Sequence, residues 1–225
     1  MTEDESALAN FSGQVRLFPL PNVVLFPHVI QGLHIFEPRY RQMMADALAS
    51  DGLITLVLLK PGWDEETEAP PEIETVGCLG RIGWHEKLPD GRYNLRLRGL
   101  GRVQLLEEQP SDRLYRSARA ELMPDIVPMD LPRLTEQRQK LAAAVLARFP
   151  QTGQAHQQLQ ELFQGEMPLG HVCDVLSYAL PLGMEVKQSL LAEPHVDLRA
   201  ELMIQAMHIP PGLANRKFPP EFSVN

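Results

Sequence analysis

The stretch Val15–Arg41 begins as an apolar run that three prolines interrupt, at positions 19, 21 and 27. Proline fixes φ and has no N–H to donate, so an ordinary central strand cannot run through the whole stretch. The pattern predicts extended pieces joined by fixed bends, with Val23–Phe26 as the strand-like part. Pro38 suits the first turn of a helix that we expect to run to about Ala49.

Strand patterns dominate the chain as far as Leu122. Leu53–Leu59 is apolar at almost every position, which predicts a short strand buried on both faces. Val76–Trp84 contains three glycines, and a glycine inside a strand often marks a bulge or a close approach of another backbone. The turn Leu88–Gly91 is followed by strict alternation of apolar and polar residues, which predicts a hairpin.

The pattern changes from strand to helix at Pro124. Apolar residues at helical spacing predict five helices between positions 134 and 207, and Pro150, Gly165 and Pro181 end the first three. The chain is therefore predicted to have four parts. These are a flexible acidic tail (1–14), a β-rich subdomain (15–122), a helical subdomain (123–208) and a proline-rich tail (209–225).

Composition narrows the classes of partner. The formal net charge of −8 argues against nucleic acid, because phosphate binding favours a basic face. No apolar run reaches the roughly 18 residues that a membrane span needs, and the first ten residues are acidic rather than a signal sequence. Cys78 and Cys173 lie in apolar settings, which is typical of core residues rather than of a disulfide. We expect a soluble, cytoplasmic protein with no membrane partner.

Motifs for catalysis or cofactor binding are absent from the sequence. It has no phosphate-binding GxxxxGK[ST] loop, no HExxH zinc motif and no GxSxG nucleophile elbow. Cys78 lies in an apolar strand, where formation of a thiolate is disfavoured. The seven histidines are scattered. The sequence therefore predicts no catalytic residue, no metal site and no cofactor.

Arginines cluster between positions 92 and 119. Arg96 and Arg98 share one face of the predicted hairpin strand, and Arg102 lies in the same cluster of the sequence. Two interpretations remain open for these three residues. They form either a solvated outer face that pairs with nearby acids or an anion-binding surface for RNA.

Four segments, in order, resemble a known family. LFPLPNVVLFP followed by LHIFEPRYR is similar to the start of the Lon N-terminal domain, the substrate-recognition domain of Lon protease. VGCLGRIGWHEKLPDGRYNLRLRGLGRVQL resembles its glycine-containing strand and hairpin, and YRSARAELMPD resembles its closing strand. DVLSYALPLGMEVKQSLLAEPHVDLRAELM resembles its helical segment. The resemblance implies an α+β fold in which a β-rich, PUA-like pseudobarrel precedes a C-terminal helical bundle.

The resemblance also implies a function. The chain looks like a stand-alone bacterial Lon-substrate-binding-domain protein, a non-catalytic protein of protein quality control that recognises unfolded or degron-like polypeptide. The ATPase and protease modules of Lon have no counterpart in this sequence. The implied partners are unfolded or peptide segments of client proteins, with a separate protease or ATPase as a further candidate. Because PUA-like folds can bind RNA, an RNA-binding module is the alternative.

Recognition of polypeptide needs either an open sheet edge for strand addition or an apolar groove. The apolar, proline-interrupted block suits both modes, and the same side chains also suit a core. The candidate peptide-binding residues are Pro19, Leu20, Pro21, Val23, Phe26, Ile35 and Phe36. The candidate residues for the RNA alternative are Arg96, Arg98 and Arg102.

Overall fold

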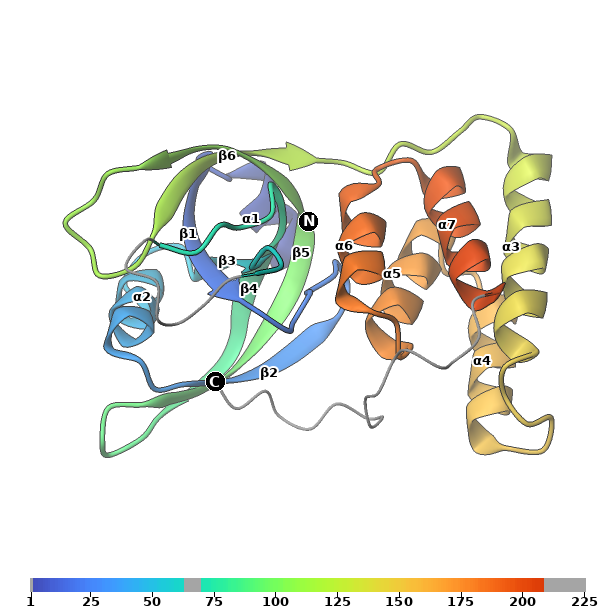
Figure 1. Ribbon diagram of the computed structural model, residues 1–225, viewed down its shortest axis with the longest axis horizontal. Coiled ribbons are helices and arrows are strands. Elements are labelled where there is room, and N and C mark those ends of the chain that lie inside the picture. Colours follow the sequence, from blue (N-terminus) through green and yellow to red (C-terminus); the bar gives the residue numbers. More distant parts are fainter. Residues whose placement is uncertain (1, 63–69, 209–225) are drawn as a thin grey trace. The chain divides into compact units, whose positions relative to one another are not determined.

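The computed structural model describes residues 2–62 and 70–208, and the chain forms two compact units that divide between Met123 and Pro124 (Figure 1). The elements of the first unit are α1 (Glu3–Ala9), β1 (Gln14–Leu20), β2 (Ile30–Ile35), α2 (Pro38–Leu48), β3 (Leu53–Leu58), β4 (Val76–Lys87), β5 (Tyr93–Gln109) and β6 (Ser117–Met123). Those of the second unit are α3 (Leu131–Leu146), α4 (Gln154–Gln164), α5 (Leu169–Ala179), α6 (Met184–Ala192) and α7 (Val196–His208).

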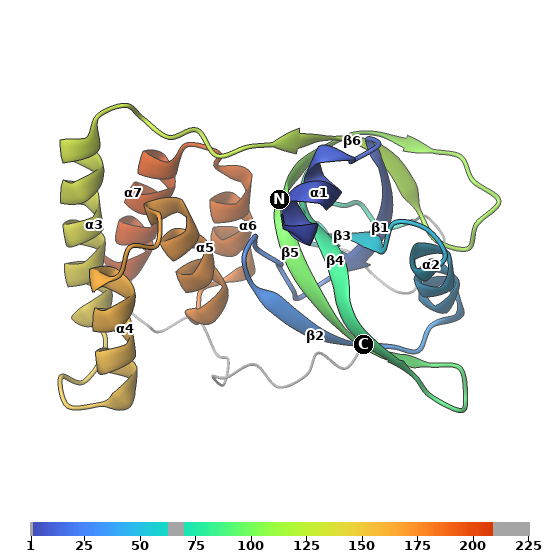
Figure 2. The same cartoon turned by 180° about the vertical axis from the view of Figure 1, so that it is seen from behind.

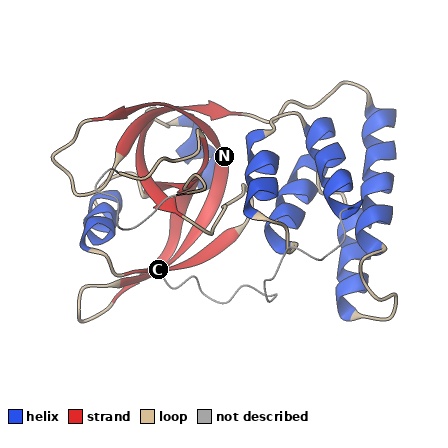
Figure 3. Ribbon diagram, in the orientation of Figure 1, coloured by secondary structure: helices blue, strands red, loops and turns tan. Residues whose placement is uncertain are grey.

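The sheet of the first unit closes on itself. Its strand order is β2-β5-β4-β3-β1-β6, and β5 also pairs with β6, so every strand except β2 belongs to a closed ring. The long strand β5 makes this possible because residues 93–98 pair with β2 whereas residues 102–109 pair with β6. Figure 3 shows the strands curving round a common interior. The helices of the second unit follow them in the chain. The predicted α+β class, with a β-rich barrel before helices, is confirmed.

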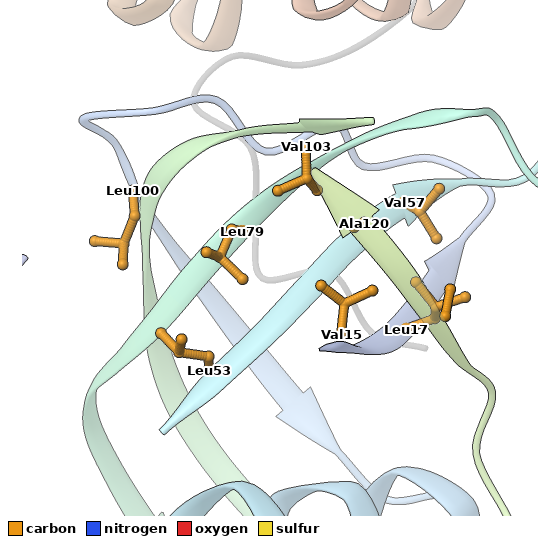
Figure 4. Packing of buried hydrophobic residues seen from close by; sticks show 9 residues of the cluster. Val15, Leu17, Leu53, Val57, Leu79, Leu100, Val103 and Ala120 are labelled. Atoms are coloured by element: carbon orange, nitrogen blue, oxygen red, sulfur yellow. The ribbon is translucent and has the colours of Figure 1, made fainter. Parts of the chain in front are cut away.

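The interior of the barrel is filled by aliphatic side chains, as the low aromatic content requires. Every residue of β3 is buried, which confirms the prediction for Leu53–Leu59. The cluster draws on five strands, β1, β3, β4, β5 and β6, and Figure 4 shows its side chains gathering in the enclosed space. The cluster consists of Val15, Leu17, Leu53, Val57, Leu79, Leu100, Val103, Ala118 and Ala120.

The glycines of β4 mark irregularities of pairing, as predicted. The register between β4 and β5 shifts between Leu79 and Gly80 and again between Ile82 and Trp84. A Cβ on Gly80 would lie 2.7 Å from Cγ of Leu97, so a side chain at this position would displace a buried leucine.

Helix α2 begins at Pro38, as predicted, and buries one face against the barrel. Tyr40 is the most polar residue on that face. Its ring centre lies 4.5 Å from that of Phe18, and its hydroxyl donates a long hydrogen bond, 3.4 Å, to the carbonyl oxygen of Pro19. Burial raises the pKa of Tyr40 from 10.0 to about 12, an effect that outweighs the opposing charge of Arg39.

This raised pKa predicts a loss of stability at alkaline pH. The unfolded tyrosine loses its proton near pH 10 and the folded one near pH 12, so Tyr40 stabilises the fold below pH 10 and this contribution disappears between about pH 10 and 12. By linkage the full loss is roughly 2–3 kcal/mol, and about half of it has occurred at pH 11. In urea titrations at pH 8 and pH 11, Tyr40→Phe should lose less stability than the wild type over this interval. Equal losses in the two proteins would contradict the assignment.

The N-terminal segment differs from the flexible tail predicted for residues 1–14. Residues Glu3–Ala9 form α1, which begins with a capping box between Thr2 and Glu5. Three apolar residues of the segment, Ala7, Leu8 and Phe11, pack against the barrel cluster. The prediction was wrong because it weighed only the acidic composition; the Thr2-x-x-Glu5 spacing is a recognisable helix-start signal.

The second unit is organised around a buried arginine on α7. The guanidinium of Arg199 bonds to Asp174 on α5 at 3.0 Å and to Asp125 at 2.5 Å, and its Nε donates to the Glu193 carbonyl oxygen. All five predicted helices are present. The predicted proline-rich tail 209–225 lies outside the described residues. Within the described part of the chain, every helix is too short or too polar to span a membrane.

Candidate functional site

Strands β2, β5 and β4 lie side by side, and the alternation of their side chains defines a surface that we call the outer face. Its residues align in three rows across the strands, and Trp84 lies in the middle row beside Arg96. The rows are Ile30-Arg98-Arg81, Gly32-Arg96-Trp84 and His34-Asn94-Glu86.

Large apolar groups are exposed on and beside the outer face. Ile30 is 48% exposed and Trp84 is 47% exposed, whereas most large apolar side chains of this unit are in the core. The guanidinium carbon of Arg96 lies 5.6 Å from the ring centre of Trp84, within the range of a cation–π contact. Phe36, 38% exposed, stacks on His34 with a ring-centre distance of 6.3 Å. The face therefore offers flat, apolar surfaces that are accessible to solvent.

A chain of polar contacts fixes one end of the outer face. Nδ1 of His34 lies 2.7 Å from Oδ1 of Asn94, and the amide nitrogen of Asn94 donates to Glu86 at 3.3 Å. On the other side of the imidazole, Arg92 lies 3.4 Å from Nε2 of His34. Because these contacts cross three strands, they hold the ring of His34 in place beneath Phe36.

Strand β2 lies at the end of the strand order, and within the described residues β5 is its only strand partner. The amide of Gly99 donates to the carbonyl oxygen of Val29 at 2.9 Å, and the Gly99 carbonyl oxygen accepts from the His28 amide, so the Val29 carbonyl points toward β5. Backbone groups along an antiparallel strand point alternately toward and away from the partner, so those of Ile30, Gly32 and His34 point away from β5. The Gly32 carbonyl oxygen accepts a 2.7 Å hydrogen bond from the Gln31 side chain.

The structure divides the predicted peptide-binding residues between core and surface. Pro19, Leu20, Phe26 and Ile35 are buried, and Phe26 is 0% exposed. In this conformation these four side chains cannot contact a polypeptide. Pro21 and Val23 are half-buried. Of the predicted residues, Phe36 alone joins the outer face.

The three arginines of the RNA alternative do not share a surface. Arg96 and Arg98 are exposed on the outer face, whereas Arg102 is buried. Arg98 also lies 3.5 Å from Asp4 of α1. Sequence reasoning missed Ile30 and Trp84, because only the register of the three strands shows that they share a face. The sequence feature that could have identified both residues is an apolar side chain at an outward-facing position of a strand that alternates between apolar and polar residues.

Two further sequence expectations concern cysteines and metals. Cys78 and Cys173 are both free thiols in buried positions. Among residues 2–62 and 70–208, no group of three or more His, Cys, Asp or Glu side chains could hold a metal ion.

The structure is that of an α+β protein in which a six-stranded sheet, closed through five of its strands, precedes a helical unit, and β2 lies at the end of the strand order. The model of the ATP-dependent protease La (LON) substrate-binding domain matches residues 14–208, and the chain belongs to this family. The predicted resemblance is thereby confirmed.

Relatives and solved structures agree with this assignment. The Lon protease of Anaeromyxobacter dehalogenans is 25% identical over 198 residues, which cover 85% of this chain and 22% of that protein. A Lon N-terminal domain protein from Xanthomonas campestris, known from its crystal structure, is 25% identical with a TM-score of 0.63, covering 85% of this chain and 97% of that one. The N-terminal domain of a Mycobacterium avium complex Lon protease shares the fold, with a TM-score of 0.67 at 15% identity over 87% of this chain and all of that one. The chain thus spans less than a quarter of the length of the first of these proteases.

Proposed function

We propose that this chain is a non-catalytic binding protein that holds unfolded or degron-like polypeptide along the edge of β2 and across the outer face. The observation that carries the proposal is the combination of an edge strand, β2, with exposed apolar side chains on the same face of the sheet, Ile30 on β2 itself and Trp84 on β4. Membership of a substrate-binding-domain family supports it. The activities of whole Lon proteases are not carried over, because the match covers only a small part of them.

Strand addition explains why the client must be unfolded. An incoming segment would pair with the outward backbone groups of Ile30, Gly32 and His34, and such pairing needs a backbone that is free of its own partners. The backbone hydrogen bonds between this segment and β2 would not depend on the amino-acid sequence of the client. Every second side chain would lie over the outer face, where Ile30 and Phe36 offer apolar contact. The Gln31 side chain, which caps the Gly32 carbonyl, would move aside.

The same proposal covers the cellular setting. We place the protein in the cytoplasm, in protein quality control, with a separate ATPase or protease as the candidate receiver of its clients. The named relatives are Lon proteases, and this chain belongs to a family described as the substrate-binding domain of an ATP-dependent protease.

Replacing Trp84 by alanine should weaken the binding of a fluorescently labelled unfolded polypeptide about tenfold, because an aromatic anchor at an interface contributes roughly 1–3 kcal/mol. Fluorescence anisotropy measures the affinity. Leu106→Ala is a matched control, since Leu106 is similarly exposed but lies on the half of β5 that pairs with β6. Equal weakening by both substitutions would contradict the placement on the outer face.

Salt separates this function from RNA binding. Apolar burial survives high salt, whereas binding to RNA through Arg96 and Arg98 would fall steeply because it releases counterions. Anisotropy titrations of a labelled polypeptide and a labelled RNA at low and high salt decide between them. Binding of RNA alone would overturn the proposed function.

A further inference from the structure

Helix α1 lies against β4 and β5, next to one end of the outer face (Figure 2). Its acidic first turn contacts the arginine row of that face. Nε of Arg81 donates to Asp4 at 2.9 Å and Nη1 donates to Glu3 at 2.8 Å, while Arg98 lies 3.5 Å from Asp4. Two outer-face arginines are thus neutralised by the chain's own N-terminal residues.

The second half of the segment makes apolar contacts. Ala7, Leu8 and Phe11 pack against the barrel cluster. Cδ2 of Leu8 lies 3.4 Å from the point where a Cβ on Gly101 would stand. Because Gly101 has no side chain, Leu8 packs directly against the backbone of β5. The surface under α1 therefore has two arginines, Arg81 and Arg98, at one end and the apolar barrel cluster at the other.

The helix is held weakly. None of its residues is fully buried, and a helix of 7 residues is marginal on its own. Glu3 is exposed and Asp4 is half-buried at the surface, where ion pairs contribute about 1 kcal/mol or less each. The segment joins β1 through Gly13, whose φ of +79° only glycine adopts without strain, and it takes no part in the sheet. It can therefore leave its place while the barrel stays intact.

We propose that α1 acts as an intramolecular ligand: it occupies and covers a second docking site for clients, beside the outer face. The occupant that displaces it is a client segment of the same chemistry, with acidic residues followed three, four and seven positions later by apolar ones, as Asp4 is followed by Ala7, Leu8 and Phe11. The inference rests on the proposed function and adds a preferred client chemistry and an autoinhibitory contact. The family match begins at residue 14, so α1 is a feature of this chain beyond the matched domain.

The test uses the full chain and a labelled synthetic peptide with the sequence of residues 2–12. Leu8→Asp should release α1, and the variant should bind this peptide at least about tenfold more tightly than the wild type does, since an intramolecular occupant competes at high effective concentration. Ala9→Asp is the matched control, because Ala9 is exposed on the same helix. Asp4→Lys, which removes the ionic half of the contact, should also raise the affinity. Circular dichroism checks that each variant is folded.

Equal affinity of wild type, Leu8→Asp and Asp4→Lys for the peptide would overturn the inference. If a neutral unfolded polypeptide still bound through Trp84, the proposed function would stand without this inference. In the opposite case the peptide binds Leu8→Asp but the neutral polypeptide binds neither protein. That result would keep the α1 site and reject its assignment to clients.

Discussion

Arg199→Ala should destabilise the second unit by about 3–5 kcal/mol, the usual cost of removing one partner of a buried ion pair. The guanidinium is 0% exposed and lies between Asp174, also fully buried, and Asp125. Burial opposes its charge, but the two carboxylates outweigh this effect and raise the pKa of Arg199 above its ordinary value. Without the arginine, the buried Asp174 carboxylate would lose its 3.0 Å ion pair in the interior of the unit.

Chemical denaturation monitored by circular dichroism measures this loss. Lys140→Ala provides the control, because Lys140 pairs with Glu136 on the exposed side of α3, where an ion pair of this spacing contributes only about 0.3–0.5 kcal/mol. If the two substitutions had the same small effect, the network around Arg199 would not stabilise the helices.

Phe26→Ala should destabilise the first unit by about 3–5 kcal/mol, the range for truncating a buried phenylalanine. Phe26 is 0% exposed. Its backbone is also packed closely, since a Cβ on Gly99 would lie 2.0 Å from the Phe26 carbonyl oxygen. A backbone held this closely has little room to shift into the cavity that the missing ring leaves, so we expect little relief from relaxation.

Phe36→Ala is the matched comparison for Phe26→Ala. The same residue type is removed ten positions later, but from an exposed site beside the outer face. Thermal and urea unfolding should show a small change for Phe36→Ala, and anisotropy should show weaker polypeptide binding. The reverse pattern, with a stable Phe26→Ala protein that binds poorly, would restore Phe26 to the binding surface.

These two phenylalanines show what the sequence can and cannot predict. The periodicity of apolar residues predicted β3 and α2 correctly, because an all-apolar run and a Pro38 start are local signals. The resemblance to the Lon N-terminal domain correctly predicted the α+β class. Burial at a single position depends on distant strands. The local pattern around Phe26 and Phe36 therefore did not separate core from surface.

The same limit applies to the candidate site. Arg96, Arg98 and Arg102 lie close together in the sequence, but the irregular pairing of β5 after Arg98 leaves Arg102 buried. Trp84 and Ile30 lie far apart in the sequence and come together through the register of three strands. A site made of paired strands becomes visible only once the pairing is known.

Amide hydrogen exchange, resolved by residue with NMR, tests the central claim most directly. In the full chain, saturation with an unfolded polypeptide should slow exchange at the outward amides of Ile30, Gly32 and His34, because a strand added at the β2 edge would accept hydrogen bonds from them. The amides of Gln31 and Leu33, which face β5, should change little. Protection confined to other strands or to the second unit, with no change along β2, would contradict polypeptide binding at this edge.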